Sequence, residues 1–192
     1  MTLPPAERPL VLASASPRRR DLLREYRYTF EVVPADVEEI NLGTPHETVL
    51  GNAQRKALAI ARLRPDALVL GVDTEVWFGG RVFGKPADLD DAFRMLRELN
   101  GKTHEVYSGV CLTWNGGERD HGFVEITRVH FHSRTDAELR AYLARISPLD
   151  KAGAYAAQDD HGEMVAQVEG SFSNVIGLPM EALARELSTL GE

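Results

Sequence analysis

The segment Ser14-Ala-Ser-Pro-Arg-Arg-Arg20 offers two hydroxyls and three guanidinium groups within seven residues. If a helix begins at Pro17, its N-terminus adds free backbone amides. Helix N-termini and fork-shaped guanidinium groups both favour phosphate oxygens. A plain helix N-cap followed by solvated arginines explains the same residues. Arginine beside the positive end of a helix dipole is unfavourable unless an anion binds there, which favours the phosphate interpretation.

A second group of residues could hold a metal ion. Asp73 follows the apolar run 67–72, and strand ends in α/β sheets open onto ligand crevices. Its carboxylate could therefore hold a divalent cation or orient water. Glu38 and Glu39 add hard oxygen ligands, of which Mg²⁺ normally takes one or two together with waters and phosphates. The alternatives are a turn aspartate after Gly71 and a solvated acidic loop.

Two lysines could neutralise phosphate charge. Lys56 stands in an alanine-rich predicted helix, and Lys85 stands in the constrained turn FGKP. Most single lysines are surface residues, so neither is decisive alone. The sequence contains no GxxxxGK[ST] loop, no GxGxxG loop and no GxSxG elbow.

Apolar periodicity predicts the elements that must position these residues. Strands are expected over 9–13, 29–34, 67–72, 106–114, 123–131 and 164–168, with a hairpin over 75–83. Helices are expected over 18–26, 45–63, 88–99 and 136–145, and from Met180 onward. This mixture predicts an α/β fold in which helices flank a sheet of mixed direction. A chain of 192 residues without a linker predicts one folding unit over 1–192.

Composition narrows the function classes. No apolar run approaches the roughly 20 residues that span a bilayer, and the start MTLPPAERPL has prolines where a signal peptide needs an apolar stretch. The single cysteine, Cys111, fits a small core residue in a reducing compartment. A formal net charge of −7 argues against broad nucleic-acid binding. We therefore expect a cytoplasmic protein that is neither secreted nor bound to membranes or nucleic acid.

Taken in order, the segments resemble the Maf family of nucleotide pyrophosphatases from about Leu10 to Leu187. The shared pieces are LASASPRRRDLL, ADVEE, NAQRKA, LGVDTEV, FGKP, LNGKTHEVYSGV, PLDKAGAYAAQ and GSFSNVIGLP. The resemblance implies two lobes around a deep cleft, a fold related to the inosine triphosphate pyrophosphatases, and a homodimer. It also implies hydrolysis of a nucleoside triphosphate to the monophosphate and pyrophosphate with Mg²⁺, or with Mn²⁺ or Co²⁺ instead.

Carried over residue by residue, the resemblance assigns a role to each matching position. The substrate-binding set is Ser14, Arg18, Arg19, Lys56, Thr74, Lys85 and Gln158. Glu39 and Asp73 would hold the metal and water, with Asp73 as general base, and Lys85 would complete the catalytic set. In this set Gln158 would face the base or the phosphates.

Thr74 is similar to the residue of the family branch that acts on dTTP and UTP. Ser147, Ala156-Ala157 and Asp159 depart from the usual family pattern near the presumed base pocket, so related or modified nucleotides stay open as substrates. One alternative is a nucleotide-binding regulator of cell division or septum formation with little turnover. Another is a phosphatase of a different metabolite, which would release orthophosphate instead of pyrophosphate.

Overall fold

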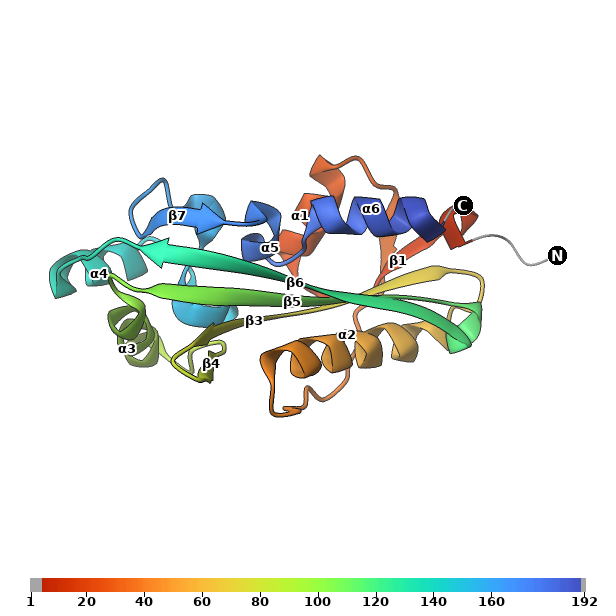
Figure 1. The fold of residues 1–192 in the computed structure, drawn as a ribbon, viewed down its shortest axis with the longest axis horizontal. Helices are drawn as coiled ribbons and strands as arrows, with labels where there is room; N and C mark the ends of the chain where they lie inside the picture. The colour runs from red at the N-terminus through yellow and green to blue at the C-terminus, as the bar shows by residue number, and fades with distance from the viewer. Residues whose placement is uncertain (1–4, 191–192) are drawn as a thin grey trace. The chain divides into compact units, whose positions relative to one another are not determined.

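The computed structural model describes residues 5–190 and contains a seven-stranded sheet (Figure 1). The N-terminal residues 1–4, part of the segment used above to predict that no signal peptide is present, lie outside this range. The strand order is β2-β1-β3-β5-β6-β7, and β4 pairs with β3. The strands are β1 (Leu10–Leu12), β2 (Phe30–Val32), β3 (Leu68–Phe78), β4 (Arg81–Phe83), β5 (Thr103–Trp114), β6 (Arg119–Phe131) and β7 (Val165–Glu169).

Parallel and antiparallel pairs occur in this one sheet. β1 is parallel to both β2 and β3, whereas β4 is antiparallel to β3 and β7 is antiparallel to β6. The α-helices are α1 (Pro17–Glu25), α2 (Pro45–Ala61), α3 (Leu89–Leu99), α4 (Asp136–Leu143), α5 (Phe172–Ile176) and α6 (Met180–Leu190). Single 3₁₀ turns cover Pro5–Glu7, Asn115–Gly117, Pro148–Asp150, Ala152–Ala154 and Ala157–Asp159. The prediction of a mixed α/β fold is confirmed.

The prediction that the third strand ends at Asp73 is wrong. β3 continues through Asp73 to Phe78, because Val76–Phe78 pair with β4 across a turn in which Gly79 and Gly80 have φ values of +58° and +81°. Pairing of β3 with β1, in contrast, ends at Leu70. Asp73 therefore lies beyond the end of β1, and the strand end that opens at this position is that of β1.

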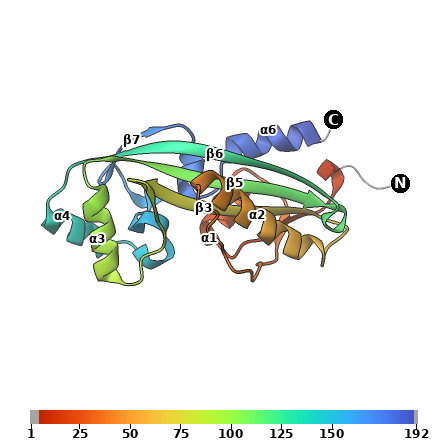
Figure 2. The same cartoon turned by 60° about the horizontal axis from the view of Figure 1, so that its bottom comes forward.

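The described residues form two compact units. Unit 1 comprises residues 5–74, 108–125 and 177–190, and unit 2 comprises 75–107 and 126–176. Figures 1 and 2 show α2 and α6 on opposite faces of the strands of unit 1. The single folding unit expected over 1–192 stays a prediction.

In unit 1, small residues bring α2 close to the sheet. Ala53, Ala57 and Ala61 of the helix are fully buried, and they pack with Val11, Val69 and Cys111 of the strands. A side chain on Gly71 would lie 2.2 Å from the carbonyl oxygen of Ala53. The helix therefore approaches β3 at a distance that only glycine allows at position 71.

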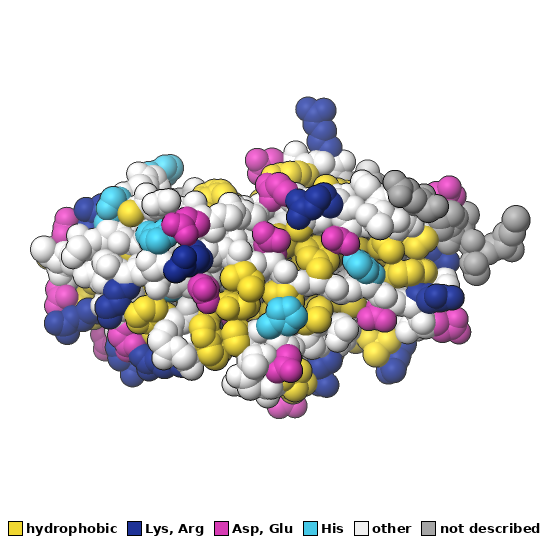
Figure 3. All heavy atoms as spheres, viewed as in Figure 1, with side chains coloured by type: hydrophobic (Ala, Val, Ile, Leu, Met, Phe, Trp, Pro, Cys, Tyr) yellow, Lys and Arg dark blue, Asp and Glu magenta, His cyan; other side chains and the backbone are white. Residues whose placement is uncertain are grey.

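Two further sequence predictions concern the buried cysteine of unit 1 and the absence of a membrane span in the chain. Cys111 is fully buried, as predicted, and burial raises the pKa of its thiol to about 11. Within residues 5–190, no helix combines the length and apolar character needed to cross a bilayer. On the face shown in Figure 3, basic and acidic side chains are interspersed with apolar ones.

In unit 2, the helix predicted over 88–99 is present as α3, and one of its faces packs into the core. Asp88 caps the N-terminus of α3 by accepting a hydrogen bond from the Asp91 amide. Ala92, Leu96 and Leu99 are buried in a core that also includes residues of β6 and α4. Helix α4 begins with a capping box in which Thr135 and Glu138 satisfy one another's backbone amides.

Candidate active site

The first turn of α1 lies where the sequence predicted an anion site. Ser16 is the N-cap residue, but its side chain makes no capping hydrogen bond, and Pro17 occupies the first helical position. Ser16 therefore does not block the amides of this turn with its hydroxyl, which is what the plain N-cap interpretation required. Arg18, the second residue of the helix, is half-buried.

Ser14 connects the end of β1 to this helix. Its side chain is buried, and its Oγ accepts hydrogen bonds from the Ser16 amide at 3.3 Å and from Arg19 Nη1 at 2.9 Å. A hydroxyl oxygen has two lone pairs, and both are used here. Within the described residues, the hydroxyl hydrogen of Ser14 is therefore left as a donor of the kind that a phosphate oxygen accepts.

Arg19 ties four parts of unit 1 together. Its Nε donates to the Gly177 carbonyl at 2.9 Å, and its Nη2 donates to Thr74 Oγ1 at 3.1 Å. Its Nη1 donates both to Ser14 and, at 3.0 Å, to the carbonyl of Val72. Four of the five N–H bonds of this guanidinium thus go to protein acceptors, which leaves one N–H for a substrate oxygen.

Burial lowers the pKa of Arg19 to about 10, against the opposing effect of the nearby Asp73 carboxylate. The group stays protonated at neutral pH, so it contributes a fixed positive charge beside Ser14. That charge also explains why the sheet tolerates the carboxylate of Asp73 at a largely buried position.

Thr74 points away from α2, to the side of β3 opposite Asp73, because side chains alternate along a strand. Its Oγ1 lies 2.8 Å from Ser108 Oγ and donates to the Gly177 carbonyl at 3.2 Å. With Arg19 donating as well, Ser108 must be the donor in the hydroxyl pair, and every hydrogen-bonding position of Thr74 is then used. Substrate binding by Thr74 stays a prediction.

The acidic residues meet at one lysine. Nζ of Lys56, on α2, is 2.7 Å from Asp73 Oδ1 and 2.6 Å from Glu39 Oε1. The side chains of Lys56 and Asp73 are 12% and 7% exposed, whereas that of Glu39 is 60% exposed. Two carboxylates, one from β3 and one from the segment before α2, therefore reach the same cation position at the edge of the solvent.

This pair suits a hard divalent cation. Both groups offer carboxylate oxygens, and their convergence on one ammonium shows that they are close enough to share a positive charge. Within residues 5–190, no cluster of three or more His, Cys, Asp or Glu side chains is placed to hold a metal ion. Water and phosphate oxygens would have to complete the coordination, as they commonly do for Mg²⁺.

Sequence reasoning missed Asn52, which is buried one helical turn before Lys56. Its Nδ2 donates to Asp73 Oδ2 and to the Ile40 carbonyl, each at 3.1 Å. Its Oδ1 accepts from the Ile40 amide at 2.9 Å. The spacing of four residues from Lys56 was a usable signal, since it places both side chains on one face of a helix.

Two predicted site residues, Lys85 and Gln158, belong to unit 2. Both are exposed, Lys85 two residues after β4 and Gln158 in the last 3₁₀ turn. The carbonyl of Gly84 accepts a hydrogen bond from the Gly153 amide at 3.1 Å, which joins the FGKP segment to the KAGAY segment within this unit. The catalytic and substrate-binding roles expected of Lys85, and substrate binding by Gln158, stay predictions.

The residues that depart from the family pattern also lie in unit 2. The carbonyl of Ser147 accepts a hydrogen bond from Lys151 Nζ at 2.7 Å. Ala156 and Ala157 are buried, and the Ala156 amide donates to the hydroxyl of Tyr142 at 3.1 Å. Asp159 is exposed. The two alanines therefore act as packing residues within this unit.

Comparison with known proteins gives a family and close relatives. A family model described as "Maf-like protein" matches residues 9–190. The dTTP/UTP pyrophosphatase of Pelotomaculum thermopropionicum is 46% identical over 184 residues, covering 95% of this chain and 96% of the relative. That of Anaeromyxobacter dehalogenans is 47% identical over 188 residues, covering 95% and 94%. That of Bdellovibrio bacteriovorus is 43% identical over 187 residues, covering 93% and 97%.

Proposed function

The chain belongs to the Maf-like protein family, and on that premise we propose that it is a nucleoside triphosphate pyrophosphatase. Its substrates are dTTP, UTP or related nucleotides, which it hydrolyses to the monophosphate and pyrophosphate. The shared name and near-complete coverage of relatives at 46% and 47% identity support this activity. The cytoplasmic location, the homodimer and the identity of the metal ion stay predictions.

The observation that carries the proposal is the sharing of Lys56 by Glu39 and Asp73. A surface ion pair would need only one exposed carboxylate, but here the second carboxylate lies largely buried on a central strand. Burying a carboxylate costs free energy unless it is paired and hydrogen-bonded. Lys56 and Asn52 supply that pairing for Asp73 and hold its carboxylate beside the exposed Glu39 at one cation position, which supports a catalytic role for Asp73.

The phosphate-binding side of the proposal rests on the first turn of α1. Ser14 supplies a hydroxyl donor, and Arg19 supplies a fixed charge and one further N–H. The helix dipole adds partial positive charge at the same turn. Fixed donors of this kind stabilise the charge that develops on phosphate oxygens without having to reorganise during the reaction.

Glu39 and Asp73 are the residues that would hold a divalent cation, which when bound neutralises phosphate charge and polarises water. Asp73 also has the geometry of a general base, since its oxygens are held by Asn52 and Lys56 and cannot rotate freely. It accepts the proton of the water that attacks the α-phosphorus. Lys56 then offsets the negative charge that accumulates on the phosphates.

The experiment is pyrophosphate release from a nucleotide panel with Mg²⁺, run beside Asp73→Asn. Loss of a general base lowers turnover by about 10²–10⁴-fold, so the variant should retain almost none. Circular dichroism checks that it is folded. Nucleotide binding without turnover would support the regulator instead, and release of orthophosphate would support the other phosphatase.

A matched pair of glutamates tests the metal-binding role. Glu39→Gln should lower turnover and raise the Mg²⁺ concentration needed for half-maximal rate, because it removes one of the two carboxylates that share Lys56. Glu38→Gln alters the preceding residue, which is also exposed, and should behave like the native protein. Equal effects of the two substitutions would contradict a specific role for Glu39.

A further inference from the structure

Asn52 holds the backbone of Ile40 at both of its polar groups. The Ile40 amide donates to Asn52 Oδ1 at 2.9 Å, and Asn52 Nδ2 donates to the Ile40 carbonyl at 3.1 Å. The side-chain amide of Asn52 thus makes the same two hydrogen bonds with the Ile40 backbone that a residue of a paired β-strand would make. Because the Ile40 amide can only donate, these partners also fix which end of the Asn52 amide is oxygen.

The second hydrogen of Nδ2 goes to Asp73 Oδ2 at 3.1 Å. Both N–H bonds of Asn52 are therefore used, one on the segment that carries Glu39 and one on β3. Asn52 is only 2% exposed, so water does not compete for these contacts. A single buried side chain consequently joins the residue next to Glu39 to the carboxylate of Asp73.

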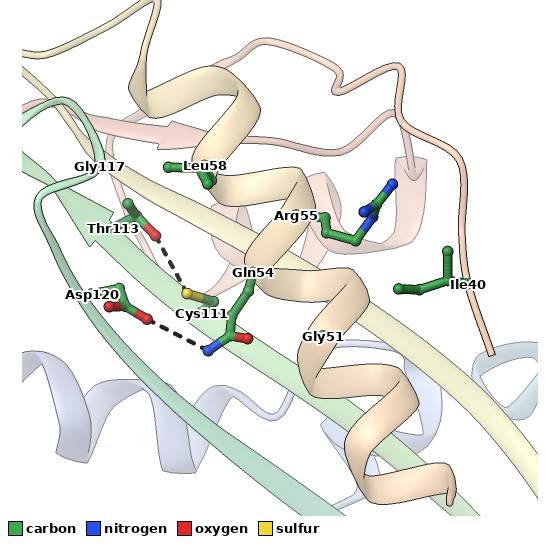
Figure 4. A pocket seen from close by; sticks show the side chains of 9 residues that line it. All are labelled: Ile40, Gly51, Gln54, Arg55, Leu58, Cys111, Thr113, Gly117 and Asp120. Carbon is green, nitrogen blue, oxygen red and sulfur yellow. Dashed lines mark hydrogen bonds between the residues drawn. The ribbon is translucent and has the colours of Figure 1, made fainter. Parts of the chain in front are cut away.

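Val33 and Ala35 pack against the core, whereas hydrogen bonds and the Glu39–Lys56 ion pair restrain the part of this segment around Ile40. Residues 33–42 have no regular secondary structure, and residues 38, 39, 41 and 42 are exposed. Ile40 borders a pocket of about 490 Å³, and Figure 4 shows it across from Gly51 and Arg55 of α2. Because open space lies beside Ile40, side-chain packing on that side does not fix its position.

We propose that Asn52 is a positioning residue that sets the spacing between the Glu39 and Asp73 carboxylates, so that together they can bind a divalent cation. This inference rests on the proposed function, because it concerns the same site. Asn52 touches neither substrate nor cation; it acts through the two carboxylates. Residues that orient metal ligands in this way typically contribute about 10–100-fold to metal affinity or activity.

The test compares Asn52→Leu with Thr48→Val, one helical turn earlier. Thr48 is equally buried and accepts a hydrogen bond from the Leu42 amide at 2.9 Å, so it holds the same segment without contacting Asp73. Asn52→Leu should raise the half-saturating Mg²⁺ concentration by at least about tenfold and lower kcat, while the KM for nucleotide at saturating Mg²⁺ changes little. Thr48→Val should leave all three values near those of the native protein.

Amide hydrogen exchange supplies a readout that does not depend on activity. In Asn52→Leu the Ile40 amide should exchange at least about tenfold faster, while amides of β1 and β3 keep their protection. Thr48→Val should instead release the Leu42 amide. If Asn52→Leu does not fold, Asn52→Ser, which is smaller, takes its place in the same measurements.

Unchanged Mg²⁺ dependence in a folded Asn52 variant would overturn the proposal, as would an equal rise in Thr48→Val. If the native protein turns over no nucleotide, the proposed function fails, and direct Mn²⁺ titration by electron paramagnetic resonance tests the inference separately. Mn²⁺ affinity should then be at least about tenfold weaker in Asn52→Leu than in Thr48→Val. Equal Mn²⁺ affinities, or no Mn²⁺ binding by the native protein, would overturn it.

Discussion

Replacing Gly71 with alanine should separate α2 from β3 and so disable the site without touching any residue that contacts substrate. A Cβ at position 71 would lie 2.2 Å from the Ala53 carbonyl oxygen, 2.7 Å from the Ala57 amide nitrogen and 2.8 Å from the Ala57 Cβ. The nearest contacts are backbone atoms of the helix, which cannot rotate away. The helix itself has to move.

The size of the movement follows from these distances. Real Cβ contacts are essentially never shorter than 3.0 Å, so α2 must retreat by about 1 Å. Ala53 and Ala57 directly follow Asn52 and Lys56 in the chain, so the same shift stretches the contacts of 3.1 Å and 2.7 Å that these residues make with Asp73. Overpacking of this kind costs about 1–3 kcal/mol of stability, whereas misplacing catalytic groups by about 1 Å can cost about 10²-fold in rate.

The assay measures kcat for pyrophosphate release at about 25 °C together with the free energy of unfolding in urea. Leu139→Ala in the core of unit 2 serves as the control, because it removes about 2–5 kcal/mol of stability from a core that includes no residue of α2. Gly71→Ala should lose far more activity than the control at equal or smaller loss of stability. If the two variants lose activity in proportion to stability, the position of α2 does not control turnover.

Two further predictions concern other buried groups. Burial lowers the pKa of His104 from 6.5 to about 3. Between these pH values the unfolded chain binds a proton at this histidine that the folded protein excludes. The free energy of unfolding should therefore fall by up to roughly 5 kcal/mol as the pH drops from about 6.5 to about 3. Urea unfolding from about pH 7 to about pH 4 should show a smaller fall for His104→Phe, and an equal fall in both proteins would exclude His104 as the cause. Arg19→Lys cannot reach all four acceptors that the guanidinium bonds, so it should cost about 1–3 kcal/mol and lower kcat/KM. Unchanged thermal unfolding and kinetics would refute the role of Arg19 as a connecting residue.

Much of the fold could be predicted because its signals are local. The helix over α3 follows from apolar spacing and the Asp88 cap, and the hairpin of β3 and β4 follows from Gly79-Gly80. The short helix α5 was not predicted, since five residues carry too little periodicity to distinguish it from a loop. The predicted strand ended before Asp73 because aspartate is a poor strand former, and pairing of Val76–Phe78 with β4 outweighed that preference.

The candidate site was predicted in part. The predictions of phosphate binding near Ser14 and of metal binding at Glu39 and Asp73 rest on residue type, which the chain displays directly. The extent to which Arg19 is already engaged depends on contacts with Val72, Thr74 and Gly177, which no local pattern indicates. Only the hydrogen bonds between distant residues therefore show which N–H groups of Arg19 hold the protein together and which one is left for a substrate.

By itself, the sequence determined most of the helices and strands in their order, and the presence of hydroxyl, guanidinium, carboxylate and lysine groups in the order of the family. Only the tertiary structure decided that Glu39, Lys56 and Asp73 meet, and that Asn52 joins two of their segments. The physical reason is that side-chain chemistry is a property of single residues. Distances between segments instead depend on how closely α2 packs on β3, and Gly71 sets that approach.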